Sequence, residues 1–414
     1  MHLEIALTLG LLLAVYASAG FGAAALVRTL PAISRELQVD AKQRQLSLDG
    51  LRGLLALNVV CHHGVVTYHF LEHGRWEAPL TRFATELGQG SVALFFMITS
   101  FLFWGRLLAV GPRLRWGQFY LARVFRLVPL YLAMVALVVV AVLVETHGQL
   151  VERKLALARE LTNWVFFTVR SAPPLNGFSS TWMIPAGVTW SLRYEWAFYL
   201  ALPLFGYIFT RARQLRWAAG SLVMLAVYFK VARSQPFLAE IGCAFIGGIV
   251  AAYWIRAEKA RALASRPIFG GVALVAGAVV FFACPQAYAL IPLGLLTVLF
   301  IAIVSDNPVF ALLRAPAVRW LGEVSYGIYL FHGIFLWATT RWIAPHWIDS
   351  SNLGRGEMVI LAVPVAFLLV VATSLLNLLV ERPGIELGRR LAKRDWKVLL
   401  RFGKPAALPG QNAV

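Results

Sequence analysis

Eleven apolar segments, most of them long enough to cross a lipid bilayer as a helix, constrain the fold of this chain more than any other feature. Of the 414 residues, 59% are hydrophobic and 14% are charged, whereas soluble domains average about 45–50% apolar and 25% charged residues. The sequence therefore predicts an all-α integral membrane protein with about 11 transmembrane helices. The predicted spans are 3–27, 48–70, 90–110, 124–145, 188–210, 214–230, 237–255, 267–283, 287–304, 321–343 and 357–380.

The connections between these segments alternate in their content of lysine and arginine. The connections on one side, together with the C-terminal tail, hold 26 of the 38 Lys and Arg residues, and the other side holds nine. The positive-inside rule then predicts a cytoplasmic C-terminus and an N-terminus outside. The net charge of +18 follows mostly from this topology, with a surplus available for anionic lipid headgroups or a phosphorylated substrate. It does not indicate nucleic-acid binding.

Arg52 and His63 lie eleven residues apart in the segment 48–70. Eleven helical residues turn through about 1100°, roughly 20° past three full turns, so the two side chains point the same way about 16 Å apart. An arginine in hydrocarbon costs roughly 2.5–3.5 kcal/mol, so such groups usually have a function. We expect both residues to line one inward-facing track. The alternative for His63 is a buried histidine that is satisfied by a neighbour.

Glu195 is predicted to lie at the same depth as His63. The segments 48–70 and 188–210 run in opposite directions, and each residue falls about 10 Å below the predicted outer surface. A glutamate that orients a histidine makes a competent general base, so His63 and Glu195 are the candidate catalytic residues. A structural Glu–His pair or a proton relay in a transporter are the alternatives. Ser191 and Tyr199 share the helix face of Glu195.

Arg123 and Arg126 stand three residues apart at the predicted cytoplasmic entrance of the segment 124–145. This spacing places both on one helix face, where two planar guanidinium groups suit phosphate oxygens. The alternative is a basic flank that touches only lipid headgroups. With Arg52 at the same level, the three arginines are predicted to converge on one phosphorylated cytoplasmic ligand.

The segment 321–343 supplies further candidates for a substrate tunnel: Ser325, Tyr326 and His332. Ser325 and His332 lie seven residues apart on one helix face. The second intramembrane histidine is expected either to line the same cavity as His63 or simply to hydrogen-bond a hydroxyl group. We expect no metal, because neither His63 nor Glu195 requires one and the three cysteines show no metal-ligand spacing.

Five motifs, in order along the chain, resemble those of the acyltransferase-3 family of integral membrane acyltransferases. The first holds Arg52, ten residues and then His63, and the second is an R-x-x-R pair. The likeness runs from about residue 46 to residue 384. The motifs are LDGLRGL (48–54) with His63, FYLARVFRLVPLY (119–131), WSLRYEWAFY (190–199), SYGIYLFH (325–332) and the E-x-P at 381–383.

The resemblance implies ten spans, so that residues 1–45 form an extra N-terminal transmembrane helix with a cytoplasmic linker. Residues 46–384 would form the membrane domain and 385–414 a basic cytoplasmic tail. It further implies an acyl-CoA-dependent O-acyltransferase of the bacterial cytoplasmic (inner) membrane, of the kind that acetylates O-antigen or exopolysaccharide. Acyl-CoA, most commonly acetyl-CoA, would donate to a hydroxyl of a carbohydrate or lipid-linked glycan outside. The matched histidine would be catalytic, and the matched arginines would hold the CoA phosphates.

The chain departs from the family pattern in one stretch, where an Asp and a Ser-Gly pair are usual. Its run VALFFMITSFL (92–102) has Ala93, Thr99 and Ser100 at these positions. We therefore expect an altered donor tunnel. The rival hypothesis is a proton-coupled transporter or flippase of a glycan or lipid-linked sugar. The absence of a visible internal repeat disfavours that hypothesis.

Overall fold

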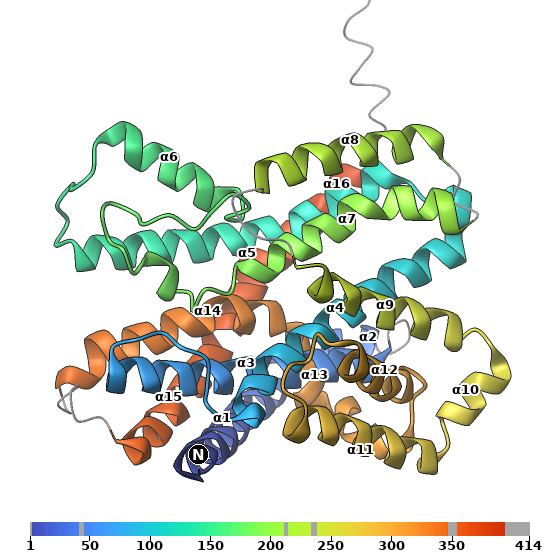
Figure 1. Ribbon diagram of the computed structural model, residues 1–414, viewed down its shortest axis with the longest axis horizontal. Coiled ribbons are helices and arrows are strands. Elements are labelled where there is room, and N and C mark those ends of the chain that lie inside the picture. The colour runs from blue at the N-terminus through green and yellow to red at the C-terminus, as the bar shows by residue number, and fades with distance from the viewer. Residues whose placement is uncertain (1, 41–44, 211–213, 233–237, 347–353, 394–414) are drawn as a thin grey trace, which may run out of the picture.

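The computed structural model describes all residues except 1, 41–44, 211–213, 233–237, 347–353 and 394–414. Its described residues form helices and connections with no β-strand (Figure 1). The predicted all-α class is therefore correct for this part of the chain. The predicted tail covers 385–414, and its residues from 394 onward lie outside the described residues.

Each of the eleven predicted segments coincides with at least one helix. The α-helices are α1 (His2–Thr29), α2 (Pro31–Asp40), α3 (Leu46–His73), α4 (Arg82–Val110), α5 (Trp116–Glu145), α6 (Lys154–Val165), α7 (Trp190–Phe209), α8 (Leu215–Ala232), α9 (Ala239–Trp254), α10 (Glu258–Ala264), α11 (Pro267–Ala283), α12 (Leu290–Val304), α13 (Pro316–Glu323), α14 (Ser325–Ala338), α15 (Arg355–Leu376) and α16 (Arg382–Lys393). Short 3₁₀ or π turns are η1 (Gly111–Arg113), η2 (Thr181–Met183), η3 (Pro308–Arg314), η4 (Thr339–Ile343), η5 (Ala344–His346) and η7 (Asn377–Glu381).

Six helices of the described chain are long and apolar enough to cross a membrane, or eight if two bent pairs each count as one span. The six are α1, α3, α4 with η1, α5, α8, and α15 continued through α16. The bent pairs are α9 with α10, at 112°, and α12 with η3, at 73°. The multi-pass membrane class follows from these helices, whereas the count of 11 and the orientation of the termini stay predictions.

The outward faces of the helices are suited to contact with lipid. Large apolar side chains are exposed on the surfaces of α1 and α11, where Leu13 is 75% exposed and Ile268 is 82% exposed. In a soluble protein such surfaces would favour aggregation, but lipid tails solvate them. These faces therefore agree with a protein whose solvent is the bilayer.

Helix α3, which carries Arg52 and His63, lies at the junction of the bundle. It packs against α1, α4, α13 and α14, while α4 packs against α9 and α5 against α16 (Figure 1). Figure 1 shows α5, α7, α8 and α16 along one side, α1, α3, α13, α14 and α15 together below them, and α9–α12 as a further group. The side chains of α3 therefore meet residues from several distant parts of the sequence.

Glycines let the backbones of α3 and α13 touch beside Arg52. A Cβ atom on Gly322 would lie 1.6 Å from the carbonyl oxygen of Asp49, and one on Gly53 would lie 2.7 Å from the nitrogen of Gly322. No larger residue fits this contact without a shift of the backbone. The glycines of LDGLRGL thus hold the helix turn that carries Arg52 at a defined position.

The N-terminal helix α1 is anchored to α3 by polar contacts as well as apolar ones. The Tyr16 hydroxyl donates to Asn58 Oδ1 at 2.7 Å, and Asn58 Nδ2 in turn donates to Ser91 Oγ at 3.2 Å. The carboxylate of Glu4 lies 3.2 Å from His69 Nε2 and accepts hydrogen bonds from the backbone nitrogens of residues 80 and 81. Helix α1 thus braces the helix that carries Arg52 and His63.

Two details of the predicted helices are wrong. The segment 321–343 is not one helix, because α13 ends at Glu323 and Val324 leaves the helical conformation (φ −92°, ψ 6°) before α14 begins. The proline of the E-x-P motif, Pro383, also predicts a stop of the last helix, since proline usually breaks a helix, but α16 continues through it. Proline is tolerated in a first helical turn, where its missing N–H has no helical partner.

Candidate active site

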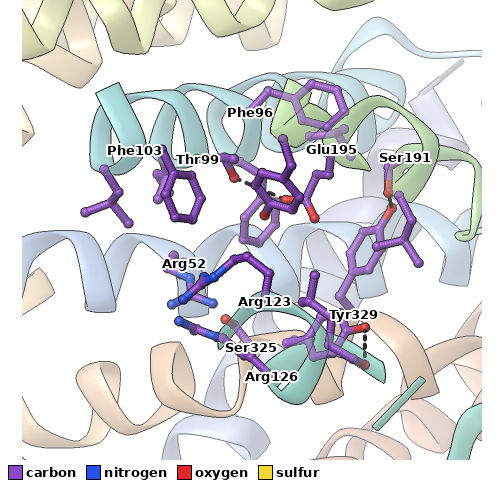
Figure 2. A pocket seen from close by; sticks show the side chains of 18 residues that line it. Arg52, Phe96, Thr99, Phe103, Arg123, Arg126, Ser191, Glu195, Ser325 and Tyr329 are labelled. Carbon is purple, nitrogen blue, oxygen red and sulfur yellow. Dashed lines mark hydrogen bonds between the residues drawn. The ribbon is translucent and has the colours of Figure 1, made fainter. Parts of the chain in front are cut away.

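Three arginines and one glutamate lie on the wall of a cavity inside the helix bundle, here called the arginine pocket (Figure 2). Its volume is about 110 Å³. Residues from α3, α4, α5, α7 and α14 contribute to it. Eight of the ten predicted site residues line this pocket: Arg52, Arg123, Arg126, Ser191, Glu195, Tyr199, Ser325 and Tyr326.

The arginines come from two helices and gather at one end of the pocket. Arg52 projects from α3, and Arg123 and Arg126 project from one face of α5 (Figure 2). The guanidinium of Arg123 lies 5.0 Å from the ring centre of Phe103, a cation–π contact that fixes its position. Arg52 and Arg126 also repel each other electrostatically, so this end of the pocket favours a bound anion.

Glu195 lies in the arginine pocket and not beside His63. Its Oε1 accepts a hydrogen bond of 3.1 Å from Thr99 Oγ1, and its charge interacts with all three arginines (Figure 2). Thr99 is one of the positions at which the chain departs from the family pattern. This departure from the family pattern therefore directly contacts the carboxylate of Glu195.

Tyrosine and serine hydroxyls line the rest of the pocket. Ser191 Oγ and the Tyr329 hydroxyl lie 2.8 Å apart, and the Tyr329 hydroxyl is also 3.2 Å from the carbonyl oxygen of Val188. The Tyr326 hydroxyl donates to the carbonyl oxygen of Leu127 at 3.1 Å, whereas Ser325 Oγ is buried without a partner. The unpartnered hydroxyl leaves one donor for a bound molecule.

The two predicted site residues that do not line the arginine pocket, His63 and His332, meet each other. His332 Nε2 lies 3.1 Å from His63 Nδ1, and the ring centres are 4.9 Å apart. His63 Nδ1 is also 3.1 Å from the carbonyl oxygen of Val59, and His332 Nδ1 is 3.2 Å from that of Ile328. His332 is completely buried.

This arrangement corrects the expectation that Glu195 orients His63. The hydrogen bonds of His63 go to Val59 and His332, and that of Glu195 comes from Thr99. Depth along a helix is predictable from the sequence, but the direction in which each helix faces its neighbours is not. His332 follows neither outcome expected for it, because it contacts His63 and the carbonyl oxygen of Ile328, not a hydroxyl, and it is not among the residues that line the cavity beside His63.

A second cavity, here called the histidine cavity, lies against His63 and has a volume of about 300 Å³. His62, Gln89, Trp190 and Tyr288 also line it. Val92 and Tyr329 line both this cavity and the arginine pocket. The two cavities therefore adjoin each other at these two side chains. The sequence reasoning did not identify Val92 or Tyr329 as shared by two cavities, since neither carries a charge.

No group of three or more His, Cys, Asp or Glu side chains that could hold a metal ion occurs in the part of the chain that the structure describes. The site there consists of arginines, a glutamate, hydroxyls and a histidine pair. Together with the spans, it defines a multi-pass helical membrane protein with an internal arginine-lined pocket near a pair of histidines.

Comparison with known proteins identifies the family to which this class corresponds. The acyltransferase-3 family model, described as an acyltransferase domain, matches residues 45–378, and the chain belongs to this family of membrane acyltransferases. It is similar to a Komagataeibacter xylinus protein described as "Putative membrane-bound transacylase BcsY", with 27% identity over 388 residues. That match covers 84% of this chain and 85% of the relative. No solved structure matches the chain significantly.

Proposed function

We propose that this protein transfers an acyl group, most simply acetyl, from cytoplasmic acyl-CoA to a hydroxyl of a carbohydrate or lipid-linked glycan on the outer side of the membrane. One observation carries the proposal above all. The arginine pocket and the histidine cavity share Val92 and Tyr329, so the candidate donor site adjoins the cavity that His63 lines.

The arginine pocket supplies the donor site. Its guanidinium groups suit the phosphates of CoA, because each planar fork binds two oxygens at once. The volume of about 110 Å³ is smaller than the roughly 300–1,000 Å³ of a typical small-molecule site. Only part of a CoA molecule therefore fits inside it, and in this proposal that part is the narrow pantetheine arm, with the nucleotide outside. Glu195, held by Thr99, keeps the guanidinium groups in place between donors.

The histidine pair supplies a base whose tautomer is defined. His332 Nδ1 faces a carbonyl oxygen and so carries the proton, which leaves His332 Nε2 as an acceptor. His63 Nδ1 must then be the donor to it, and His63 Nε2 is left unprotonated. His63 is therefore the base, and His332 is the residue that orients it, in the role that we first expected for Glu195.

The chemistry balances without a metal. His63 Nε2 takes the proton of the acceptor hydroxyl as its oxygen attacks the thioester carbonyl, the C–S bond breaks, and the thiolate receives a proton to leave as CoA. In the alternative route His63 Nε2 attacks the thioester itself, and an acyl-histidine then passes the acyl group to the hydroxyl. Both routes need the same free Nε2. Mass spectrometry of acid-quenched protein distinguishes them by an added acyl mass on the peptide that contains His63.

Purified protein in lipid nanodiscs with radiolabelled acetyl-CoA and bacterial glycan fractions tests the proposal. We expect CoA release and labelled glycan with the natural protein, and neither with His63→Ala. Thermal stabilisation by CoA should survive His63→Ala but not a combined Arg123→Gln and Arg126→Gln change. Full transferase activity in His63→Ala, or substrate flux without acyl-CoA, would contradict the proposal and favour a transporter.

A further inference from the structure

A third cavity, here called the aromatic cavity, lies next to the histidine pair and has no part in the reaction described so far. Its volume is about 290 Å³, the space of roughly ten water molecules. Its walls come from the end of α3 and the residues after it, from the connection before α7, and from α14 with the turns that follow. The lining residues that carry the argument are Thr67, Trp76, Phe178, Ser180, Trp337 and Thr340.

The aromatic cavity lies close to the histidine pair. On α3, Thr67 stands four residues after His63 and therefore one turn further along the same face. On α14, Gly333 directly follows His332, and Trp337 comes one turn later. Trp76 connects the cavity to the histidine pair, because it lines the cavity and its ring centre lies 6.3 Å from that of His63.

Aromatic rings meet at right angles around this cavity. Phe178 and Trp337 lie 6.1 Å apart at an interplanar angle of 84°, and Trp76 and Trp182 lie 5.9 Å apart at 77°. Such rings pack against the C–H faces of a sugar, whose hydroxyls point outward around its rim. The volume suits one sugar ring.

Polar groups in the same walls argue for a sugar and against a lipid chain. Trp337 lines the cavity, and its Nε1 is buried without a hydrogen-bond partner just beneath the cavity surface, so that a turn of the indole would present it to a bound hydroxyl. Thr67, Ser180 and Thr340 add hydroxyl groups to the lining. An acyl chain would leave the indole N–H unpaired, which is unfavourable, whereas a sugar hydroxyl satisfies it.

The connection before α7 is held against α14 in a way that shapes the cavity. A Cβ atom on Gly333 would lie 2.4 Å from the nitrogen of Ala186, so only glycine permits this approach. Ala186 itself has a φ of 53°, a left-handed conformation that residues other than glycine seldom adopt. Strained residues such as Ala186 concentrate at ligand sites, and Ala186 lines the aromatic cavity together with Gly333.

We propose that the aromatic cavity binds one sugar ring of the acceptor and directs a hydroxyl toward His63. This inference rests on the proposed function, since it supplies the acceptor subsite of that same reaction. Trp337 Nε1 donates to the sugar, Trp76 covers it on the side of His63, and the hydroxyls around the cavity bind its rim.

The test measures binding of methyl glycosides of glucose, galactose, mannose and N-acetylglucosamine to the full-length protein in lipid nanodiscs by calorimetry. We expect at least one glycoside to bind. Trp337→Phe keeps the ring but removes the N–H and should weaken binding about two- to tenfold, the effect of one neutral hydrogen bond. Trp104→Phe is the matched control, because its N–H is likewise buried without a partner and the residue lies outside the cavity. It should leave the affinity unchanged.

Thr67→Val provides a second variant if Trp337→Phe does not fold. The inference is overturned if no glycoside binds, if neither cavity variant weakens binding, or if decanoate binds with the same dependence on Trp337. CoA binding and CoA release are measured on the same samples. If both persist while no glycoside binds, only the acceptor subsite is refuted; if CoA binding itself is absent, the proposed function fails.

Discussion

Replacing His332 by phenylalanine should slow acyl transfer while leaving donor binding intact. His332 Nε2 lies 3.1 Å from His63 Nδ1, and in the proposed tautomer it accepts a hydrogen bond from Nδ1–H. When His63 takes a proton from the acceptor, this hydrogen bond becomes charge-assisted. Hydrogen bonds to charged groups contribute about 1.5–3 kcal/mol, which corresponds to a fall in kcat of about 10- to 150-fold.

The assay is CoA release in the presence of glycan, with kcat and the KM for acetyl-CoA measured separately. His332→Gln is the conservative variant, because its side-chain carbonyl oxygen reaches about as far as Nε2 and also accepts. We expect Phe to lower kcat with KM unchanged and Gln to restore most of the rate. Both variants should retain stabilisation by CoA, which shows that they are folded. The reasoning is refuted if the Phe variant keeps the full rate, or if Gln and Phe lose it equally.

Three further predictions concern the arginine pocket and the helix contact beside it. Arg123→Gln should raise the KM for acetyl-CoA about tenfold or more with little change in kcat, since a charged hydrogen bond to phosphate is lost. An unchanged KM in steady-state assays would be inconsistent with the proposed donor site. Thr99→Val removes the donor to Glu195 and should raise the same KM about two- to tenfold, again by steady-state kinetics. Gly322→Ala places a Cβ atom 1.6 Å from the carbonyl oxygen of Asp49 and should lower stability by about 1–3 kcal/mol or more, visible as a lower Tm.

The membrane class and most of the arginine pocket could be predicted from the sequence. Hydropathy predicts membrane-spanning helices directly, because only helices or closed barrels can cross the hydrocarbon core of a bilayer. The three-residue spacing of Arg123 and Arg126 places both on one face whatever the fold around them. The family motifs add the order in which such residues occur along the chain.

The pairing of side chains between helices could not be predicted in the same way. Helical spacing gives the depth of His63 and Glu195, but not how far each helix is rotated or tilted in the bundle. The structure therefore joins His63 to His332 and places Glu195 with Thr99. The break at Val324 could not be predicted for a related reason, because an apolar run shows no sign of a local change in backbone conformation.

Transfer across a sealed membrane tests the central claim most directly. The protein is reconstituted into liposomes with radiolabelled acetyl-CoA on one side only and glycan acceptor on the other, and the acylated glycan is counted after separation. The account predicts acylated glycan on the side opposite the donor, with none from His63→Ala. Acylation confined to the side that holds acetyl-CoA would contradict a reaction path from the arginine pocket to the histidine cavity.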